Sequence, residues 1–255
     1  MPRCLLIDLG NSRIKWALAS SGRIAKQSAM AHSGRWTAGL DKALAAAITA
    51  AGSAHCVSVA SMAMTRSLVF CLRRHRLPVK MLRSQRSQRG LRNAYREPWR
   101  LGADRWAAML GVRAFGATDK SWLIVSAGTA VTVDLLDSSG RHRGGVIVPG
   151  RQLMVQSLLA DTAGIARRAR ASGKNRLGAA QGHVFARNTE LALRSGAHVA
   201  TVALVEKLRV EARRELGHYP VVVLTGGDAP ALALKLKCKS LLVPNLVLRG
   251  LLAAF

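Results

Sequence analysis

The sequence predicts an α/β protein in which one strand–turn–strand unit occurs twice. Three observations support this fold class. Short apolar runs of strand-like composition alternate with longer segments of helical periodicity. Two hairpins, about 120 residues apart, share the order strand, glycine-polar turn, strand. Several apolar runs end directly in glycines. The repeat predicts two lobes, an N-terminal lobe over residues 1–118 and a C-terminal lobe over 119–255.

The N-terminal lobe begins with a hairpin, because the Gly-Asn-Ser turn joins the apolar runs "RCLLIDLG" and "RIKWALA". A helix is expected over "WTAGLDKALAAAITAAG", ended by Gly52. The same reading gives the rest of this lobe: a strand "CVSVA", a helix "TRSLVFCLRRH", a strand "VKML", an Arg-rich loop "RSQRSQRGLRNAYREPWR", and a helix "GADRWAAMLGVRAFGA".

The C-terminal lobe restarts the pattern. A strand over 122–126 runs into the small-residue turn 127–129, and a second strand covers 131–136. The elements expected after this hairpin are a strand "GGVIVPG", a long helix over roughly 182–215, a buried strand "VVVLTGG", a helix "APALALKLK", a strand "LLV", and a final helix "LVLRGLLAAF".

Composition limits the classes of function. About half of the 255 residues are apolar, so the chain can bury a substantial core. It shows neither an apolar run long enough to cross a bilayer nor a signal-peptide pattern, which predicts a cytoplasmic protein without a membrane partner. The four scattered cysteines argue against a zinc site and a disulfide framework. The seven histidines show no metal-ligand spacing and are interpreted as incidental.

The charge is strongly basic, with 39 Lys and Arg against 13 Asp and Glu, a net charge of +26. Such a field attracts phosphates, nucleotides and nucleic acids. Because Arg outnumbers Lys throughout, a solvated surface with a compositional bias is the favoured interpretation. Nucleic-acid contact stays a second hypothesis.

Three turns share free backbone N–H groups and glycines that permit close approach: "DLGNS", "SAGTA" and "TGGDA". Such turns bind anions, and in α/β proteins they gather at the carboxyl ends of strands. Asp8 is suited to hold Mg²⁺, and Lys15 to neutralise phosphate oxygens. Any single turn is compatible with an ordinary hairpin. The three together favour a nucleoside triphosphate site.

A second cluster, "YREPWRLGADRW", places Asp104 at the start of a helix. One interpretation is a helix-capping carboxylate. The other is a general base that takes a proton from an attacking hydroxyl. Spacing alone leaves both open.

These segments together resemble the type III pantothenate kinase family. "DLGNSRIK" is similar to its first phosphate motif, D-x-G-N-[TS]-x-x-K, and "YREPWRLGADR" to its pantothenate motif, Y-x-x-P-x-x-L-G-x-D-R. "SAGTAVTVD" is similar to the second phosphate motif, D-x-G-T-A-x-T-x-D, and "GGVIVPG" and "FARNTELALRSG" follow in the family's order. The resemblance covers nearly the whole chain.

The resemblance implies a two-lobed, actin/hexokinase-like (ribonuclease H-like) duplicated fold. It implies a homodimeric kinase that transfers the γ-phosphoryl group of ATP, with Mg²⁺, to pantothenate in the first step of coenzyme A biosynthesis. Asp104 is then the proton acceptor, and Asp8 lies near Mg²⁺. The implied ATP-binding residues are Asp8, Leu9, Gly10, Asn11, Ser12, Arg13, Ile14, Lys15 and Thr129. The implied pantothenate-binding residues are Tyr95, Gly102, Ala103, Arg105 and Thr189.

One position departs from the family pattern. The second phosphate motif of the family begins with an Asp that binds an activating monovalent cation, potassium or ammonium. Ser126 stands there in this chain. A neutral hydroxyl lacks the charge that attracts such an ion, so we expect weak or absent potassium dependence.

Two other functions are compatible with parts of the pattern. A regulatory paralogue with impaired catalysis, acting on gene expression and associated with nucleic acid, would fit the charge and Ser126. Against it, the chain keeps both the phosphate-binding residues, Asp8 and Lys15, and the base, Asp104. A sugar or acetate kinase of the same fold would not need "YREPWRLGADR".

Overall fold

The computed structural model describes residues 3–116, 119–171 and 184–255. Contacts between Cα atoms divide the chain into two units. Unit 1 comprises residues 1–122, 134–144 and 245–255, and unit 2 comprises 123–133 and 145–244. The boundary predicted at residue 118 falls outside the described residues, so the two-lobe division at that point stays a prediction.

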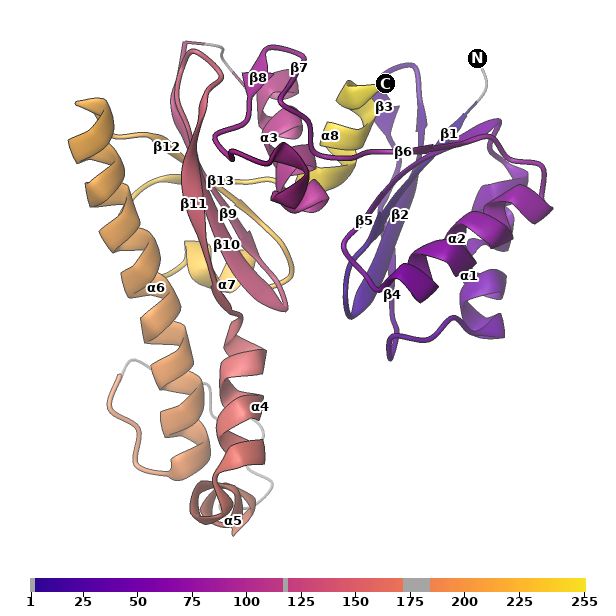
Figure 1. Cartoon of the computed structure of the whole chain (residues 1–255). Helices are drawn as coiled ribbons and strands as arrows, with labels where there is room; N and C mark the ends of the chain where they lie inside the picture. Colours follow the sequence, from indigo (N-terminus) through magenta and orange to yellow (C-terminus); the bar gives the residue numbers. More distant parts are fainter. Residues whose placement is uncertain (1–2, 117–118, 172–183) are drawn as a thin grey trace. The chain divides into compact units, whose positions relative to one another are not determined.

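The first sheet is built on the predicted N-terminal hairpin (Figure 1). Its main path runs in the order β3 (Arg23–Ile24), β2 (Arg13–Ser20), β1 (Cys4–Leu9), β5 (Ser53–Ser58) and β6 (Val79–Met81), and β4 (Ser28–Ala31) also pairs with β2. β1 is antiparallel to β2 and parallel to β5. This mixed arrangement needs a helical crossover between the parallel strands.

The second sheet repeats the strand order of the first. It runs β11 (His142–Pro149), β10 (Ala130–Leu136), β9 (Trp122–Ala127), β12 (Val221–Thr225) and β13 (Ser240–Leu242). Numbered along the main path of each sheet, which leaves out β4, both follow the order 3-2-1-4-5. The repeated hairpin in the sequence is therefore the start of two topologically equivalent sheets, and the predicted duplication is confirmed.

The faces of the first sheet follow from strand alternation. Leu5, Ile7 and Leu9 of β1 belong to a buried cluster with α1 (Ala38–Thr49) and α2 (Met62–Arg74). Leu6 and Asp8 point to the opposite face, which α3 (Ala103–Phe115) and α8 (Leu246–Ala254) cover (Figure 1). One carboxylate in an otherwise apolar strand is thus directed toward the helix that carries Asp104.

Helices α3 and α8 pack closely within unit 1 because glycines remove side chains from their contact. A Cβ on Gly111 or Gly250 would overlap the backbone of the other helix. The helices that cover unit 2 are α4 (Arg151–Asp161), α5 (Ala163–Ala171), α6 (Thr189–Leu216) and α7 (Ala229–Ala233). None of the described helices combines the length and hydropathy that a membrane span requires.

The Arg-rich segment predicted as a loop contains regular structure. It forms the hairpin β7 (Ser87–Gln88) and β8 (Leu91–Arg92), followed by a 3₁₀ helix, η1 (Pro98–Arg100). Arg89 and Gly90 both have positive φ, at 50° and 78°. Two such residues form a tight hairpin turn, but Arg is an unusual first member, so this segment lacks the usual sequence signal of a hairpin.

Two further elements differ from expectation. Residues 151–171 fold into α4 and α5, although no element was expected there. Helix α6 begins at Thr189, whereas the predicted helix began at residue 182. Residues 182 and 183 lie outside the described residues. Asn188 is the N-cap of α6 and defines its start, because its Oδ1 accepts a hydrogen bond from the Leu191 N–H at 2.8 Å.

Candidate active site

The first phosphate turn joins β1 to β2. Asp8 and Lys15 are opposed in the strand register, and Lys15 Nζ lies 3.5 Å from Asp8 Oδ2. Gly10 N–H donates to the Arg13 carbonyl at 2.9 Å and closes the turn. Leu9 and Ile14 are fully buried and anchor the two ends of the turn in the core.

His32 braces this turn from outside, a role that the sequence did not reveal. Gly34 N–H donates to its Nδ1 at 3.1 Å, so the ring proton resides on Nε2. Nε2 then donates to the Gly10 carbonyl at 3.0 Å, and the His32 N–H donates to the Ser12 carbonyl at 3.0 Å. The interpretation of the histidines as incidental is wrong here, because both contacts connect residues far apart in sequence.

Asp8 is a carboxylate in a site poor in water. It is 7% exposed. Burial raises its pKa, the Lys15 cation lowers it, and the negative charge of Asp104 raises it further. The mutual effect of Asp8 and Asp104 shows that two predicted site residues, almost a hundred positions apart, share one electrostatic environment within unit 1.

Asp104 lies at the first turn of α3. Its Oδ1 accepts a hydrogen bond from the Arg105 N–H at 2.8 Å, which satisfies one of the free donors of the helix start. Burial raises the pKa of Asp104, against the lowering effects of the Arg105 N–H and guanidinium. Both interpretations of Asp104 are compatible, since capping uses one oxygen and leaves the second for a proton.

Gly102 precedes Asp104 and leaves it room. A Cβ at position 102 would stand 2.7 Å from Asp104 Oδ1, closer than real contacts. Its φ of −53° is ordinary, so the need for glycine comes from the carboxylate and not from the backbone. Gly102 is also the N-cap of α3.

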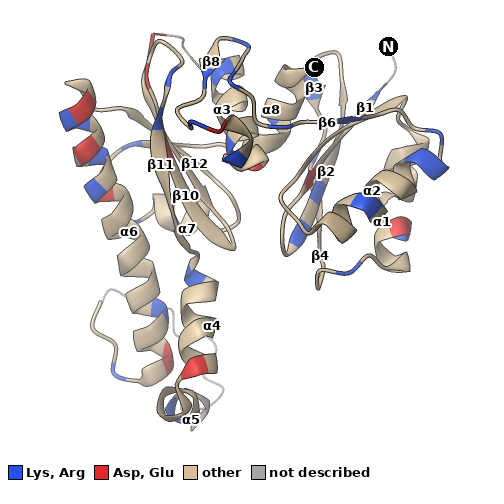
Figure 2. Ribbon diagram, in the orientation of Figure 1, with Lys and Arg blue, Asp and Glu red and all other residues tan. Residues whose placement is uncertain are grey.

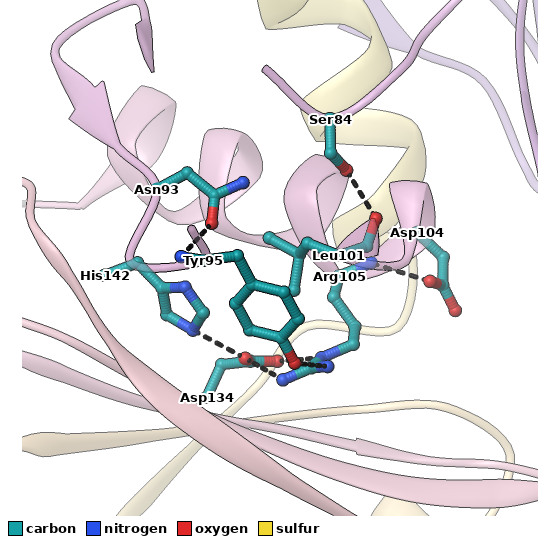
Figure 3. A network of polar contacts seen from close by, with 8 residues as sticks. All are labelled: Ser84, Asn93, Tyr95, Leu101, Asp104, Arg105, Asp134 and His142. Carbon is teal, nitrogen blue, oxygen red and sulfur yellow. Dashed lines mark hydrogen bonds and ion pairs between the residues drawn. The ribbon is translucent and has the colours of Figure 1, made fainter. Parts of the chain in front are cut away.

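A buried polar network adjoins Asp104 (Figure 3). Arg105, 5% exposed, donates from Nε and Nη2 to the two carboxylate oxygens of Asp134, at 2.9 and 2.6 Å. Its Nη1 donates to Tyr95 Oη at 3.1 Å. His142 Nε2 contacts Asp134 Oδ1 at 2.9 Å. Sequence reasoning named Arg105 and Tyr95 but not Asp134 or His142, although Asp134 is the final residue of "SAGTAVTVD".

The segment that carries Tyr95 is held by backbone contacts. The Tyr95 N–H donates to Asn93 Oδ1 at 3.0 Å, and Ser84 Oγ donates to the Leu101 carbonyl at 2.8 Å (Figure 3). The β10–β11 turn supports it, since the Arg92 N–H donates to the Gly140 carbonyl at 2.9 Å.

In unit 2 the second and third glycine turns contact each other. Gly226, at φ 96°, packs on the Ala127 backbone so closely that a Cβ would overlap it, and the Asp228 N–H donates to the Ala127 carbonyl at 3.1 Å. The Gly150 N–H donates to the Thr129 carbonyl at 2.8 Å. Within this unit, three glycine-containing segments therefore meet beside Ser126.

The other predicted residues of unit 2 occupy accessible positions. Thr129 is exposed in the second turn, and Ser126 is partly buried at the end of β9. Thr189 is the first residue of α6 and partly buried. Arg151 donates from Nε and Nη2 to the two oxygens of Asp228, at 3.2 and 3.3 Å, which ties the start of α4 to the third turn.

The residues fit a divalent cation. No group of three or more His, Cys, Asp or Glu side chains suited to a metal occurs in the described part of the chain. Mg²⁺ does not need one, because it usually takes one or two carboxylates and completes its shell with phosphate oxygens and water. Burial and a neighbouring carboxylate raise the pKa of Asp8, so a cation would stabilise its ionised form.

Among the described residues, the basic side chains do not gather at a separate site. Lys and Arg are spread over helices and loops of both units (Figure 2). Several form exposed pairs along α6, such as Arg194 with Glu190 at 2.9 Å and Lys207 with Glu211 at 2.6 Å. This distribution agrees with the favoured interpretation of a solvated surface.

Comparison with known proteins gives one consistent result. The model of the type III pantothenate kinase family matches residues 4–211. A protein of Nitrosococcus oceani described as a type III pantothenate kinase is 34% identical, over 97% of this chain and 91% of the relative. Another with this description, from an Azoarcus species, is 36% identical over 97% of this chain and 88% of the relative.

A solved structure supports the fold alone. The activator of 2-hydroxyisocaproyl-CoA dehydratase from Clostridium difficile, with bound ADPNP, superposes with a TM-score of 0.52 at 14% identity, covering 99% of this chain and 92% of the other. The predicted actin/hexokinase-like fold is thereby confirmed, in agreement with the two sheets of equal strand order.

Proposed function

Because the chain belongs to the type III pantothenate kinase family, it is an ATP-dependent kinase of pantothenate, and we propose that Asp104 is its general base. The observation that carries this assignment is the position of Asp104: half-buried at the start of α3, with one oxygen bound to the Arg105 N–H and its charge felt by Asp8. The reaction transfers the γ-phosphoryl group of ATP to the hydroxyl of pantothenate.

In the proposed mechanism, Asp104 accepts the proton of the attacking hydroxyl on Oδ2, since Oδ1 is bound to the helix start. The oxygen–phosphorus bond to pantothenate forms as the bond to the ADP oxygen breaks. A carboxylate suffices as base because phosphoryl transfer depends mainly on positioning and charge neutralisation. The raised pKa of Asp104 improves its match to neutral pH.

The remaining roles follow from the charges of the predicted site residues. Lys15 neutralises phosphate oxygens of ATP, and Asp8 holds Mg²⁺, whose charge offsets that of the phosphates when it is bound. Residues 8–15 and Thr129 bind ATP in this proposal, and Tyr95, Gly102, Ala103, Arg105 and Thr189 bind pantothenate. Ser126 offers no charge for a monovalent cation, so turnover needs no potassium. We also propose that the protein is cytoplasmic and acts as a homodimer.

The test measures ATP consumption with and without pantothenate for the wild type and for Asp104→Asn. We expect pantothenate-dependent turnover in the wild type and a loss of about 10²- to 10⁴-fold in kcat in the variant, the usual contribution of general-base catalysis. The KM for ATP should be unchanged. Wild-type protein that consumes ATP without regard to pantothenate, or a fully active variant, would refute the assignment.

A further inference from the structure

The buried pair Asp134 and His142 has no role in the mechanism above. We propose that these two residues position Arg105 and thereby set the affinity of the site for pantothenate. This inference rests on the proposed function, because it takes Arg105 to contact the substrate.

Asp134 fixes the plane of the guanidinium. Its carboxylate is 2% exposed and accepts from both Nε and Nη2 of Arg105. Two parallel bonds between a carboxylate and a guanidinium allow one orientation, unlike a single contact. A third contact, from Nη1 to Tyr95 Oη, holds the other edge of the guanidinium.

His142 in turn holds the carboxylate. It is fully buried, and its Nδ1 meets no hydrogen-bond partner among the described residues. A carboxylate oxygen only accepts hydrogen bonds, so the proton of the contact with Asp134 is on Nε2. Nε2 therefore donates to Asp134 Oδ1. The ring also stacks beside Tyr95, at 6.0 Å between centroids and 19° between planes.

The network leaves donors for a ligand. A guanidinium has five N–H groups, and the described bonds use three. One N–H on Nη1 and one on Nη2 remain. Since pantothenate carries a carboxylate and hydroxyl groups, these donors match its chemistry, and their direction is set by Asp134 and His142 (Figure 3).

Stability alone gives a weak reason for such a cluster. Buried ion pairs are often replaced by apolar side chains with no loss of stability. In this pair, Arg105 directly follows Asp104 in the sequence. A positioning role accounts for an ionised group kept at this place in the core.

A matched pair of variants tests the inference: His142→Gln and His142→Asn. The Gln amide nitrogen is as many bonds from Cα as Nε2, so it can still donate to Asp134. The Asn amide nitrogen is only as many bonds from Cα as Nδ1, so it is too short to replace the donor at Nε2. Both are polar and smaller than His, so they share any general cost in the core. His55→Leu, a partly buried histidine of the same unit outside the site, serves as the control.

The measurement is KM for pantothenate and for ATP, kcat, and Tm. We expect His142→Asn to raise KM for pantothenate about tenfold or more above that of His142→Gln, the scale of one lost bond to a charged group. KM for ATP should be the same in both, and His55→Leu should keep wild-type values of KM.

Equal KM for pantothenate in both variants and the wild type would overturn the inference alone. So would a parallel change of both KM values that follows Tm, which marks a merely structural role. A wild type without pantothenate-dependent turnover would overturn the proposed function and this inference with it.

Discussion

Replacing Gly102 by Ala tests whether the position of Asp104 matters for catalysis. The new Cβ would stand 2.7 Å from Asp104 Oδ1, whereas ordinary contacts begin at about 3.4 Å. The carboxylate oxygen must therefore move by about 0.7 Å. The backbone needs no adjustment, because φ at residue 102 is −53°, a value that Ala adopts readily.

The expected magnitude follows from the displacement. A shift of about 1 Å costs about 10²-fold in rate, so a shift of about 0.7 Å in this catalytic group predicts a loss in kcat of about tenfold or more. Gly is preferred to Ala at an N-cap, so we expect a loss of about 1 kcal/mol in stability, which the fold should tolerate. The assay is steady-state turnover with saturating ATP and pantothenate, together with thermal denaturation to compare Tm.

Gly39→Ala is the matched control. Position 39 lies at the start of α1 and is exposed, and a Cβ there meets ordinary contacts at 3.5 and 3.6 Å. It should keep wild-type kcat and Tm. If Gly102→Ala kept the full kcat of the wild type, the observed place of Asp104 would not be the one that catalysis requires, and the argument from this carboxylate would fail.

Two further outcomes are expected. Turnover should be equal in sodium and in potassium buffers, because Ser126 presents a neutral hydroxyl; a strong potassium requirement would contradict this. Asp104→Asn should unfold at a higher Tm than the wild type at pH 7, because burial raises the pKa of Asp104 and its ionised form therefore costs stability. As the pH falls through this raised pKa, the wild-type carboxyl becomes protonated and the gap in Tm should close. A lower Tm for the variant throughout would show that the charge is stabilising.

The first hairpin shows how far local pattern reaches. The apolar run "CLLIDL" and the Gly-Asn-Ser turn predict two paired strands, and the structure has β1 and β2 at nearly the expected bounds. The same pattern places Asp8 opposite Lys15, since a hairpin turn fixes the register. Local information was sufficient because the two residues are neighbours in one hairpin.

The Arg-rich segment shows where local pattern fails. Its hairpin depends on Arg89 and Gly90 at positive φ and on the Arg92 N–H bound to the Gly140 carbonyl. The partner lies almost fifty residues away and is a backbone group, which leaves no mark in the side chains. The segment therefore resembled a loop, although it carries Tyr95 in a defined place.

The sequence by itself determined the duplicated α/β fold and the phosphate turns, because apolar runs and glycine turns are encoded in neighbouring residues. Its ordered motifs, through their resemblance to a family, indicated the candidate base. Only the tertiary structure decided which partners these residues have. Asp134 accepts hydrogen bonds from Arg105, His142 bonds to Asp134, and His32 supports the turn at Gly10. The contacts of Arg105 with Asp134 and of His32 with Gly10 join segments 29 and 22 residues apart, and burial strengthens the Asp134 contacts by excluding water. No local pattern carries that information.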